Sequence, residues 1–398
     1  MSVGRKRRAG PLRFLFMSTC PEPWGGSEEL WWAAAIALLR DEHEVTVLKR
    51  KLDRKHPRIR ELLEAGGSAH ELDGFGGQDS WNAGRVVLPK GRPGDFSRRQ
   101  VYTAAGWLRM RRPDRVVISQ GGNVEGTHLG RLCARRGIEY ALIAQKASDF
   151  DWPDDDSRIP IAEAYRRARQ VIFVSDHNRR LTEDQLGLDL GAALVWPNPF
   201  LVGSDGPLPW PGDDGGLRIA CVGRLFPREK GQDILLRVLA EEPWRSRSVE
   251  LEIYGKGVNR QTLIDMAERL GLGNVHFRGH TGDVGGVWRR NHLLALPSRS
   301  EGLPLVLVEA MLCGRPGVVT DVGGARELVT DGRDGFIAGA PTVEAFAVAM
   351  ERAWSQRAEL ERIGLLAAAT AREHVGEDDP GARLAHALVA DMDAAAAA

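Results

Sequence analysis

Two carboxylates bracket a junction between a predicted loop and a predicted helix in the stretch SRSEGLPLVLVEAMLCG. Glu301 lies in the loop, and Pro304 suits the first helical position because its missing N–H would have no partner there. We expect the helix over Leu305–Leu312, ended by Gly314, with Glu309 inside it. The unpaired N–H groups at such a helix start favour an anion such as a phosphate.

The two carboxylates themselves suit hydroxyl groups. Glu301, in the loop, can accept hydrogen bonds from sugar hydroxyls, and Glu309, on the helix, can bind a ribose diol. The stretch is equally consistent with Glu301 as a helix cap and Glu309 as a surface residue.

A second stretch, CVGRLFPREKG, follows a predicted strand and precedes a helix. Gly223 permits close backbone approach, and Arg224 and Lys230 are cations that can neutralise a departing diphosphate without a metal ion. A solvated loop with incidental charges is the alternative. The stretch matches neither G-x-x-x-x-G-K-[ST] nor G-x-G-x-x-G, which removes the usual support for ATP hydrolysis or NAD binding.

A third stretch, PEPWGGSEELWW, places two glycines at a strand-to-helix turn. Gly25 and Gly26 let backbone amides approach a ligand. Ser27 suits an N-cap, and Glu28 and Glu29 suit a first helical turn. A plain tight turn is the alternative reading.

These stretches lie in two series of alternating strands and helices. Apolar runs such as LRFLFMS, EVTVLKR, DRVVISQ, YALIAQ, RQVIFVS and ALVWPNP alternate with helical segments, which is typical of a parallel sheet buried on both faces. A segment rich in Pro, Gly and Asp, residues 198–216, interrupts the pattern, which restarts with LRIACVG and VELEIYG. We predict an α/β fold with one domain over residues 1–205, a second over 206–376, and a C-terminal helix over 377–398 that packs back on the first. Ligands of such sheets bind beyond the carboxyl ends of the strands, and two domains in tandem predict a cleft.

Composition excludes several classes of protein. The 398 residues include 54 Lys and Arg and 54 Asp and Glu, a balance that gives no drive toward nucleic acid. No apolar run reaches the roughly 20 residues needed to span a bilayer. The basic start, Arg5 to Arg8, lacks a following cleavage site, so no signal peptide is predicted. It is a solvated tail or, alternatively, attracts an anionic membrane surface.

Cysteine and histidine usage gives no metal pattern. The cysteines lie far apart and predict buried, inert thiols in a reducing compartment; they are Cys20, Cys133, Cys221 and Cys313. His276 and His280 flank a predicted strand end rather than one helix face, which argues against a zinc site.

Taken together, the motifs resemble one family, the retaining glycosyltransferases of the "glycosyl transferases group 1" class (family four), which have the GT-B fold. The matching blocks cover most of the chain in order: GGSE, VGRL with KG, YGKG, NVHFRG, LPSRSEGLPLVLVEAM and VGGARELVTDGRDGF. The resemblance implies two Rossmann-like domains that face each other across a cleft. The first would bind the acceptor and the second the nucleotide-sugar donor.

Site residues follow from the same resemblance. Arg224 and Lys230 would hold the donor phosphates, Glu301 would face the sugar hydroxyls, and Glu309 would bind the ribose. Backbone around further positions would border the donor: Gly25, Gly26, Gly223, Gly279, His280, Leu303, Leu305 and Val306. Pro304 offers no N–H there.

The chain departs from the family's pattern at the end of the strand YALIAQ. Many family members carry a His at its end, near the donor sugar, where this chain has Gln145, which hydrogen-bonds but cannot titrate. We group Gln145 with the catalytic residues; the alternative is that it satisfies backbone groups. The segments SQGGNVEG and KASDFDWPDD are assigned to the acceptor, with five candidate contacts: Gly122, Asn123, Lys146, Asp149 and Trp152.

The resemblance predicts a hexosyltransferase that moves a sugar from a nucleotide diphosphate sugar, UDP- or GDP-linked, to a hydroxyl of a glycan, lipid-linked or small-molecule acceptor. It implies retention of anomeric configuration and no metal or other cofactor. It also implies a role in polysaccharide biosynthesis and a cytoplasmic location, with at most peripheral contact at the inner membrane face. The alternatives are a non-catalytic or altered sugar-nucleotide binder and a GT-B-fold sugar-nucleotide epimerase.

Overall fold

The chain forms two compact units. The computed structural model describes residues 10–73, 96–200, 206–212, 215–376 and 379–397. One unit comprises Met1–Pro199 with Asp378–Ala398, and the other comprises Phe200–Glu377. The division therefore lies a few residues before the predicted one, and the C-terminal segment belongs to the first unit.

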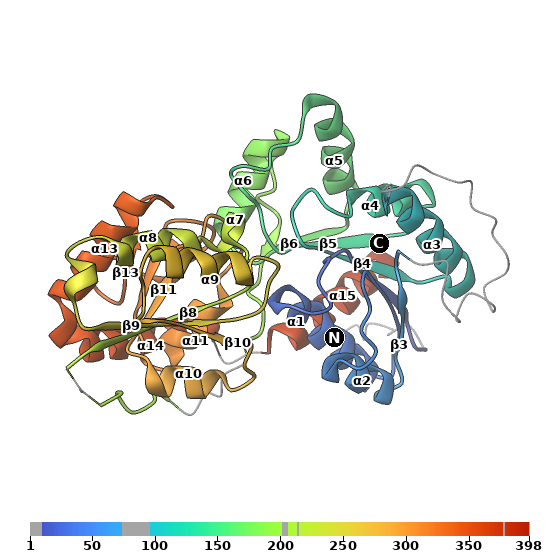
Figure 1. The fold of residues 1–398 in the computed structure, drawn as a ribbon. Helices are drawn as coiled ribbons and strands as arrows, with labels where there is room; N and C mark the ends of the chain where they lie inside the picture. The colour runs from blue at the N-terminus through green and yellow to red at the C-terminus, as the bar shows by residue number, and fades with distance from the viewer. Residues whose placement is uncertain (1–9, 74–95, 201–205, 213–214, 377–378, 398) are drawn as a thin grey trace. The chain divides into compact units, whose positions relative to one another are not determined.

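The first unit is built on a parallel sheet in the order β3-β2-β1-β4-β5-β6-β7 (Figure 1). Its strands are β1 Arg13–Ser18, β2 Glu44–Lys49, β3 Ser68–Glu71, β4 Arg115–Gln120, β5 Tyr140–Ala144, β6 Gln170–Phe173 and β7 Leu194–Val195. The expected strand ALVWPNP is cut to the two residues of β7, because the prolines that follow have no N–H for the ladder. The sequence analysis did not predict β3, a short edge strand.

Helices cover both faces of this sheet. They are α1 Glu29–Arg40, α2 Pro57–Glu64, α3 Phe96–Arg111, α4 Thr127–Arg135, α5 Asp155–Arg167, α6 Asp176–Leu186 and α15 Pro380–Ala397, with a 3-10 turn η1 Gly26–Glu28. Alternate residues of β1 point to opposite faces. Phe14 and Phe16 join the core that α1 and α15 cover, and Leu15 and Met17 join the core on the other face. Burial on both sides explains the continuous apolar runs.

The C-terminal helix α15 packs along α1 (Figure 1). Leu384, Ala385 and Leu388 are buried in the core beneath it. A Cβ at Gly381 would lie 2.2 Å from the Cβ of Ala33, so the two helices approach closely at a glycine.

The second unit has a parallel sheet in the order β10-β9-β8-β11-β12-β13. Its strands are β8 Leu217–Val222, β9 Val249–Tyr254, β10 Val275–Gly279, β11 Leu293–Leu296, β12 Gly317–Thr320 and β13 Phe336–Ala338. Its helices are α7 Pro227–Lys230, α8 Gln232–Ala240, α9 Arg260–Arg269, α10 Val284–Arg290, α11 Leu305–Leu312, α12 Ala325–Leu328, α13 Val343–Ser355 and α14 Leu360–Val375, with 3-10 turns η3 Trp244–Ser246 and η4 Arg357–Glu359. The predicted bounds of α11 are confirmed.

Both sheets reverse their strand order at one point, between β1 and β4 in the first unit and between β8 and β11 in the second. At such a reversal the loops that follow the two central strands diverge to opposite faces, and ligands of open α/β sheets bind between them. The predicted phosphate and sugar contacts of the second unit follow β8 and β11, so the topology places them at this reversal, whereas Gly279 and His280 lie at the end of the edge strand β10.

A buried arginine ties the start of the second unit to its core. Arg315 is 1% exposed and lies 5.1 Å from the Trp210 ring. Its guanidinium donates to carbonyl oxygens of Trp288, Asn291, Cys313, Gly314, Leu208 and Pro209. Burial lowers the pKa of Arg315 to about 10, so the side chain remains charged at neutral pH.

The four cysteines are free and buried, as predicted. In the described part of the chain, no helix has the length and apolar composition needed to cross a membrane. The basic segment Arg5 to Arg8 lies outside the described residues.

Candidate functional site

An ion pair joins the two most informative loops of the second unit. Lys230, the last residue of α7, places its Nζ 2.7 Å from both carboxylate oxygens of Glu301. The Ser298 hydroxyl donates to the same carboxylate at 2.6 Å. Glu301 is 7% exposed. The sequence analysis gave these side chains separate contacts, whereas the structure brings them into one hydrogen-bonded group.

Backbone contacts hold the Glu301 loop in place. The Glu229 carbonyl accepts from the amides of Arg299 and Ser300, and the Thr320 hydroxyl donates to the Ser298 carbonyl. Gly323 has φ +55°, and a Cβ there would lie 2.5 Å from the Glu301 carbonyl oxygen. The loop is therefore fixed against the segments that follow both β8 and β12.

Arg224 lies in the loop after β8. Its guanidinium is 2.5 Å from the Glu229 carboxylate, and Gln232 donates to its carbonyl at 2.8 Å. Burial raises the pKa of the neighbouring Cys221 thiol to about 12, so this cysteine is not a nucleophile at neutral pH. The two cations predicted to bind phosphate, Arg224 and Lys230, are both partly exposed, and a third cation of this stretch, Arg228, is exposed.

Close packing of the backbone after β8 depends on the two glycines of the YGKG motif. A Cβ at Gly223 would come no closer than 3.8 Å, to Lys230, among its described neighbours. In contrast, a Cβ at Gly255 would lie 1.9 Å from the Gly223 carbonyl oxygen, and one at Gly257 would lie 2.2 Å from that of Leu225. The YGKG motif therefore supplies the glycines that the packing requires, which the sequence analysis did not identify.

Pro304 is the N-cap of α11 and not its first helical residue. Pro304 has φ −72° and ψ 100°, an extended conformation at the N-cap, and the first helical residue is Leu305. Leu305 and Val306 are half-buried, whereas Leu303 is 5% exposed. Glu309, in the middle of the helix, is 6% exposed, which excludes the surface alternative for its side chain.

The predicted border of the nucleotide base lies at the end of β10. Gly279 has φ +77°, and its carbonyl accepts from Gly255 N–H at 2.8 Å. His280 is exposed, and His276 pairs with Glu250 at 2.6 Å. Among the described residues, no group of three His, Cys, Asp or Glu side chains could hold a metal ion.

In the first unit, the glycine pair follows β1 as predicted, but the flanking residues have different roles. Gly26 begins the 3-10 turn, and a Cβ at Gly25 would come no closer than 3.9 Å to its described neighbours. Ser27 is not the N-cap of α1; its hydroxyl contacts Cys20 Sγ at 3.6 Å. Glu28 precedes the helix, and its carboxylate is buried in an ion pair with Lys49, because the 3-10 turn directs this side chain inward.

Gln145 follows β5 and is 5% exposed. Its Oε1 accepts from Asn198 Nδ2 at 2.7 Å. Gln145 Nε2 and Asn198 Oδ1 have no partner among the described residues. A hydrogen bond between two side-chain amides leaves the NH2 group of one and the carbonyl oxygen of the other available, whichever way both are turned. The pair can therefore bind one further polar group, and Asn198 was not predicted.

The predicted acceptor residues after β4 and β5 divide into two kinds. The Asn123 amide is 2% exposed and donates to Thr182 and Gln185 inside the unit, so it supports the loop and is not a surface contact. Its backbone N–H donates to the Lys146 carbonyl at 2.7 Å. Gly122 and Lys146 are partly exposed.

Trp152 is the most exposed of the predicted acceptor contacts. It is 57% exposed, and its indole N–H donates to the Asp149 carbonyl at 2.9 Å. Asp149 is also exposed. An aromatic ring fixed by one hydrogen bond offers a face on which a sugar ring can stack.

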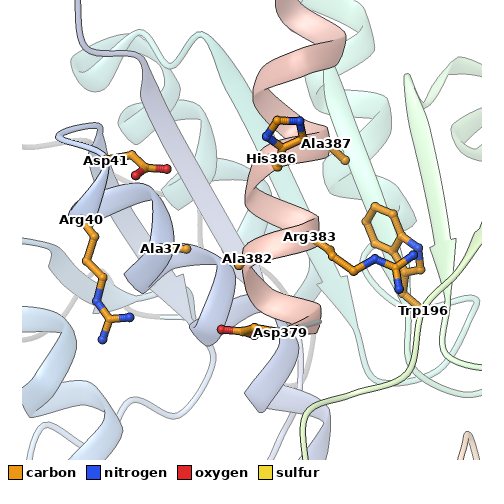
Figure 2. A pocket seen from close by; sticks show the side chains of 9 residues that line it. All are labelled: Ala37, Arg40, Asp41, Trp196, Asp379, Ala382, Arg383, His386 and Ala387. Carbon is orange, nitrogen blue, oxygen red and sulfur yellow. The ribbon is translucent and has the colours of Figure 1, made fainter. Parts of the chain in front are cut away.

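A groove in the first unit lies apart from these residues. Figure 2 shows it between α1 and α15, with Arg40 and Asp41 from the end of α1 and Arg383 and His386 from α15. The Arg383 guanidinium lies 5.3 Å from the Trp196 ring. None of the predicted site residues lines this groove.

The chain is similar in sequence to glycosyltransferases. Residues 216–356 match the family Glycosyl transferases group 1. The chain is 31% identical over 247 residues to a GDP-mannose-dependent alpha-(1-6)-phosphatidylinositol monomannoside mannosyltransferase of Mycolicibacterium smegmatis, covering 56% of this chain and 63% of that protein. It is 34% identical over 164 residues to a D-inositol 3-phosphate glycosyltransferase of Gordonia bronchialis, covering 38% of this chain and 36% of that protein. The matched part thus spans between about a third and just under two-thirds of these relatives.

Similarity in fold extends over nearly the whole chain. The crystal structure of Anabaena Alr3699/HepE in complex with UDP-glucose matches with a TM-score of 0.67 and 19% identity, covering 96% of this chain and 100% of that one. At this identity the likeness shows the fold. Residues 216–356 therefore belong to the glycosyl transferases group 1 family, and the chain, with its two Rossmann-like parallel sheets, has the GT-B fold.

Proposed function

We propose that the protein is a retaining glycosyltransferase that moves a sugar from a nucleotide diphosphate sugar to an acceptor hydroxyl without a metal ion. The observation that carries this proposal is the Lys230–Glu301–Ser298 group at the strand-order reversal of the second unit. It combines a cation suited to a phosphate with a carboxylate suited to sugar hydroxyls.

Charge development explains the roles. When the bond between the anomeric carbon and the diphosphate breaks, its electron pair remains on the diphosphate while the acceptor oxygen bonds to that carbon. Lys230 and Arg224 are placed to stabilise the added negative charge, as preorganised cations do at a leaving group. Glu301 accepts hydrogen bonds from the sugar, Glu309 binds the ribose, and the Gln145–Asn198 amides offer a neutral polar contact.

Donor identity is the first point to test. The Mycolicibacterium relative is named for GDP-mannose and the Anabaena structure contains UDP-glucose, so we propose a UDP- or GDP-sugar. A thermal-shift screen of both nucleotide diphosphates and their sugars should show stabilisation by one base, because a ligand stabilises by RT ln(1 + [L]/Kd). The product made with that donor, examined by NMR, should retain the anomeric configuration.

Substitution of Glu301 and substitution of Glu309 should affect ligand binding differently. In E301Q, a nucleotide diphosphate should bind as tightly as before or more tightly, because Lys230 loses its carboxylate partner, while turnover of the sugar nucleotide falls. In E309Q, both the diphosphate and the sugar nucleotide should bind more weakly. About 1–3 kcal/mol is at stake for each charged hydrogen bond.

Calorimetry with the nucleotide diphosphate measures this difference directly. An E327Q variant, changed on the short helix α12, serves as the control for a neutralised glutamate in the same unit. Loss of diphosphate affinity in E301Q together with normal affinity in E309Q would show that the roles are wrongly assigned.

Chelation should leave activity intact. Arg224 and Lys230 supply the positive charge that a divalent ion supplies in metal-dependent enzymes. Activity should therefore be equal in EDTA and in magnesium or manganese. Activity that disappears in EDTA and returns with either ion would contradict the metal-free proposal.

A sugar-nucleotide binder without transferase activity is the second candidate, because a neutral Gln145–Asn198 pair stands at a predicted catalytic position. Slow hydrolysis of the donor in the absence of an acceptor distinguishes the two, since a pure binder leaves the donor intact. A glycan, lipid-linked or small-molecule acceptor, a role in polysaccharide biosynthesis and a cytoplasmic location remain proposals that acceptor screening and fractionation can test.

A further inference from the structure

A buried ion pair lies beneath the glycine loop of the first unit. Lys49 Nζ is 2.6 Å from Glu28 Oε2, and the two side chains are 0% and 1% exposed. The Ser18 hydroxyl donates to the same carboxylate at 2.9 and 3.0 Å. Ser18 ends β1 and Lys49 ends β2, and the two residues are paired in the sheet. The pair therefore lies at the carboxyl edge, beside the strand-order reversal.

The stability of the fold alone does not explain why these two charged side chains are buried. Removing two charges from water is costly, and apolar residues of similar volume often stabilise a fold as well as a buried ion pair does. Lys49 makes one contact that an apolar side chain could not make. Its Nζ donates to the Glu22 carbonyl at 3.0 Å, which fixes the backbone of the loop between β1 and η1.

Hydrogen bonds also hold the part of this loop that leads into α1. The Trp24 indole N–H donates to Glu29 at 2.7 Å, and Glu28 N–H donates to the Gly25 carbonyl at 2.9 Å. Gly25 and Gly26 lie between these attachments, and Gly26 is exposed. Lys49 therefore holds the backbone of a segment that carries the partly exposed Gly25 and the exposed Gly26.

We propose that Lys49, through Glu28 and the Glu22 carbonyl, is a positioning residue that holds the Gly25–Gly26 amides in the conformation needed to contact the anionic diphosphate of the donor. This inference rests on the proposed function for the ligand. The effect of Lys49 on the loop stands on the contacts alone.

The test compares two pairs of substitutions. K49M/E28Q removes both charges together, which avoids an uncompensated buried charge. R115M/E139Q is the control, because Arg115 is also 0% exposed and lies 2.6 Å from Glu139, which is 45% exposed, but Arg115 begins β4 at the opposite edge of the sheet. K49R keeps a positive charge and N–H donors at this position.

Hydrogen exchange of the segment 20–30 is the first measurement, because it needs no activity. Exchange at Gly25 and Gly26 should be faster in K49M/E28Q, unchanged in R115M/E139Q and close to wild type in K49R. With the donor identified, kcat/KM should fall roughly ten- to a hundredfold in K49M/E28Q, since small misplacements of binding groups have effects of this size, and K49R should restore most of it.

The outcomes separate the two proposals. A folded K49M/E28Q with wild-type exchange and kinetics overturns the positioning role, and so does an equal kinetic loss in R115M/E139Q. If K49M/E28Q does not fold, wild-type exchange and kinetics in K49R support the role, and faster exchange in K49R without any loss of kcat/KM opposes it. A wild-type protein that neither binds nor turns over any nucleotide sugar contradicts the proposed function, while the exchange result still decides whether Lys49 fixes the loop.

Discussion

Replacing Lys230 by Ala is expected to lower kcat a hundredfold or more while the protein remains folded. Removing one preorganised electrostatic group from the site of charge development costs on the order of 3 kcal/mol. Lys230 is the candidate because its Nζ, 2.7 Å from Glu301, lies where the donor's phosphate and sugar are proposed to meet. Steady-state kinetics with the identified donor measures the effect.

Two controls separate catalysis from folding. R228A changes an exposed cation on the same short helix and should leave kcat near the wild-type value. K230A/E301Q removes the charge that K230A leaves without its cation, and it should be as inactive as K230A. Near-normal turnover in a folded K230A protein would refute the assignment of Lys230 to the diphosphate.

Replacing Arg315 by Met is expected to destabilise the second unit by roughly 3 kcal/mol or more. The guanidinium serves six backbone carbonyls, and each buried carbonyl left without a partner costs about 1–3 kcal/mol. Methionine keeps much of the side chain's volume, so the loss reports mainly on these hydrogen bonds. Urea denaturation followed by circular dichroism, with hydrogen exchange to locate the transition, measures the change.

Arg326 provides the matched control for this substitution. It is 58% exposed in an ion pair with Asp321, and such pairs contribute about 0–1 kcal/mol. R326M should therefore unfold close to the wild-type urea concentration. If R315M matched R326M, water would be replacing the guanidinium at the carbonyls, and Arg315 would not anchor the segment 207–210.

Local sequence patterns predicted much of the fold, because they report on forces that act within a few residues. Continuous apolar runs predicted strands such as β4 and β5, since both faces of these strands are covered. Pro304 and Gly314 predicted the bounds of α11 as Leu305–Leu312. The edge strand β3, with the sequence SAHE, was missed because an edge strand needs no long apolar run.

The partners of the charged side chains depend on tertiary structure. Lys230 and Glu301 are 71 residues apart, and they meet because the strand order reverses between β8 and β11. Glu28 has the residue type and position of a first-turn acid, yet the 3-10 turn before α1 directs it to Lys49. The packing of β9 beside β8 requires a glycine at Gly255, which the sequence analysis did not identify.

The sequence by itself therefore determined the alternating α/β fold, the family, and the residue types that phosphate and sugar recognition require. Tertiary structure decided which of those residues form a connected group, which ones support loops, as Asn123 does, and that Asn198 joins Gln145. The physical reason is that a side chain's type limits the interactions it can make, whereas burial and strand order decide which partner lies within hydrogen-bonding distance.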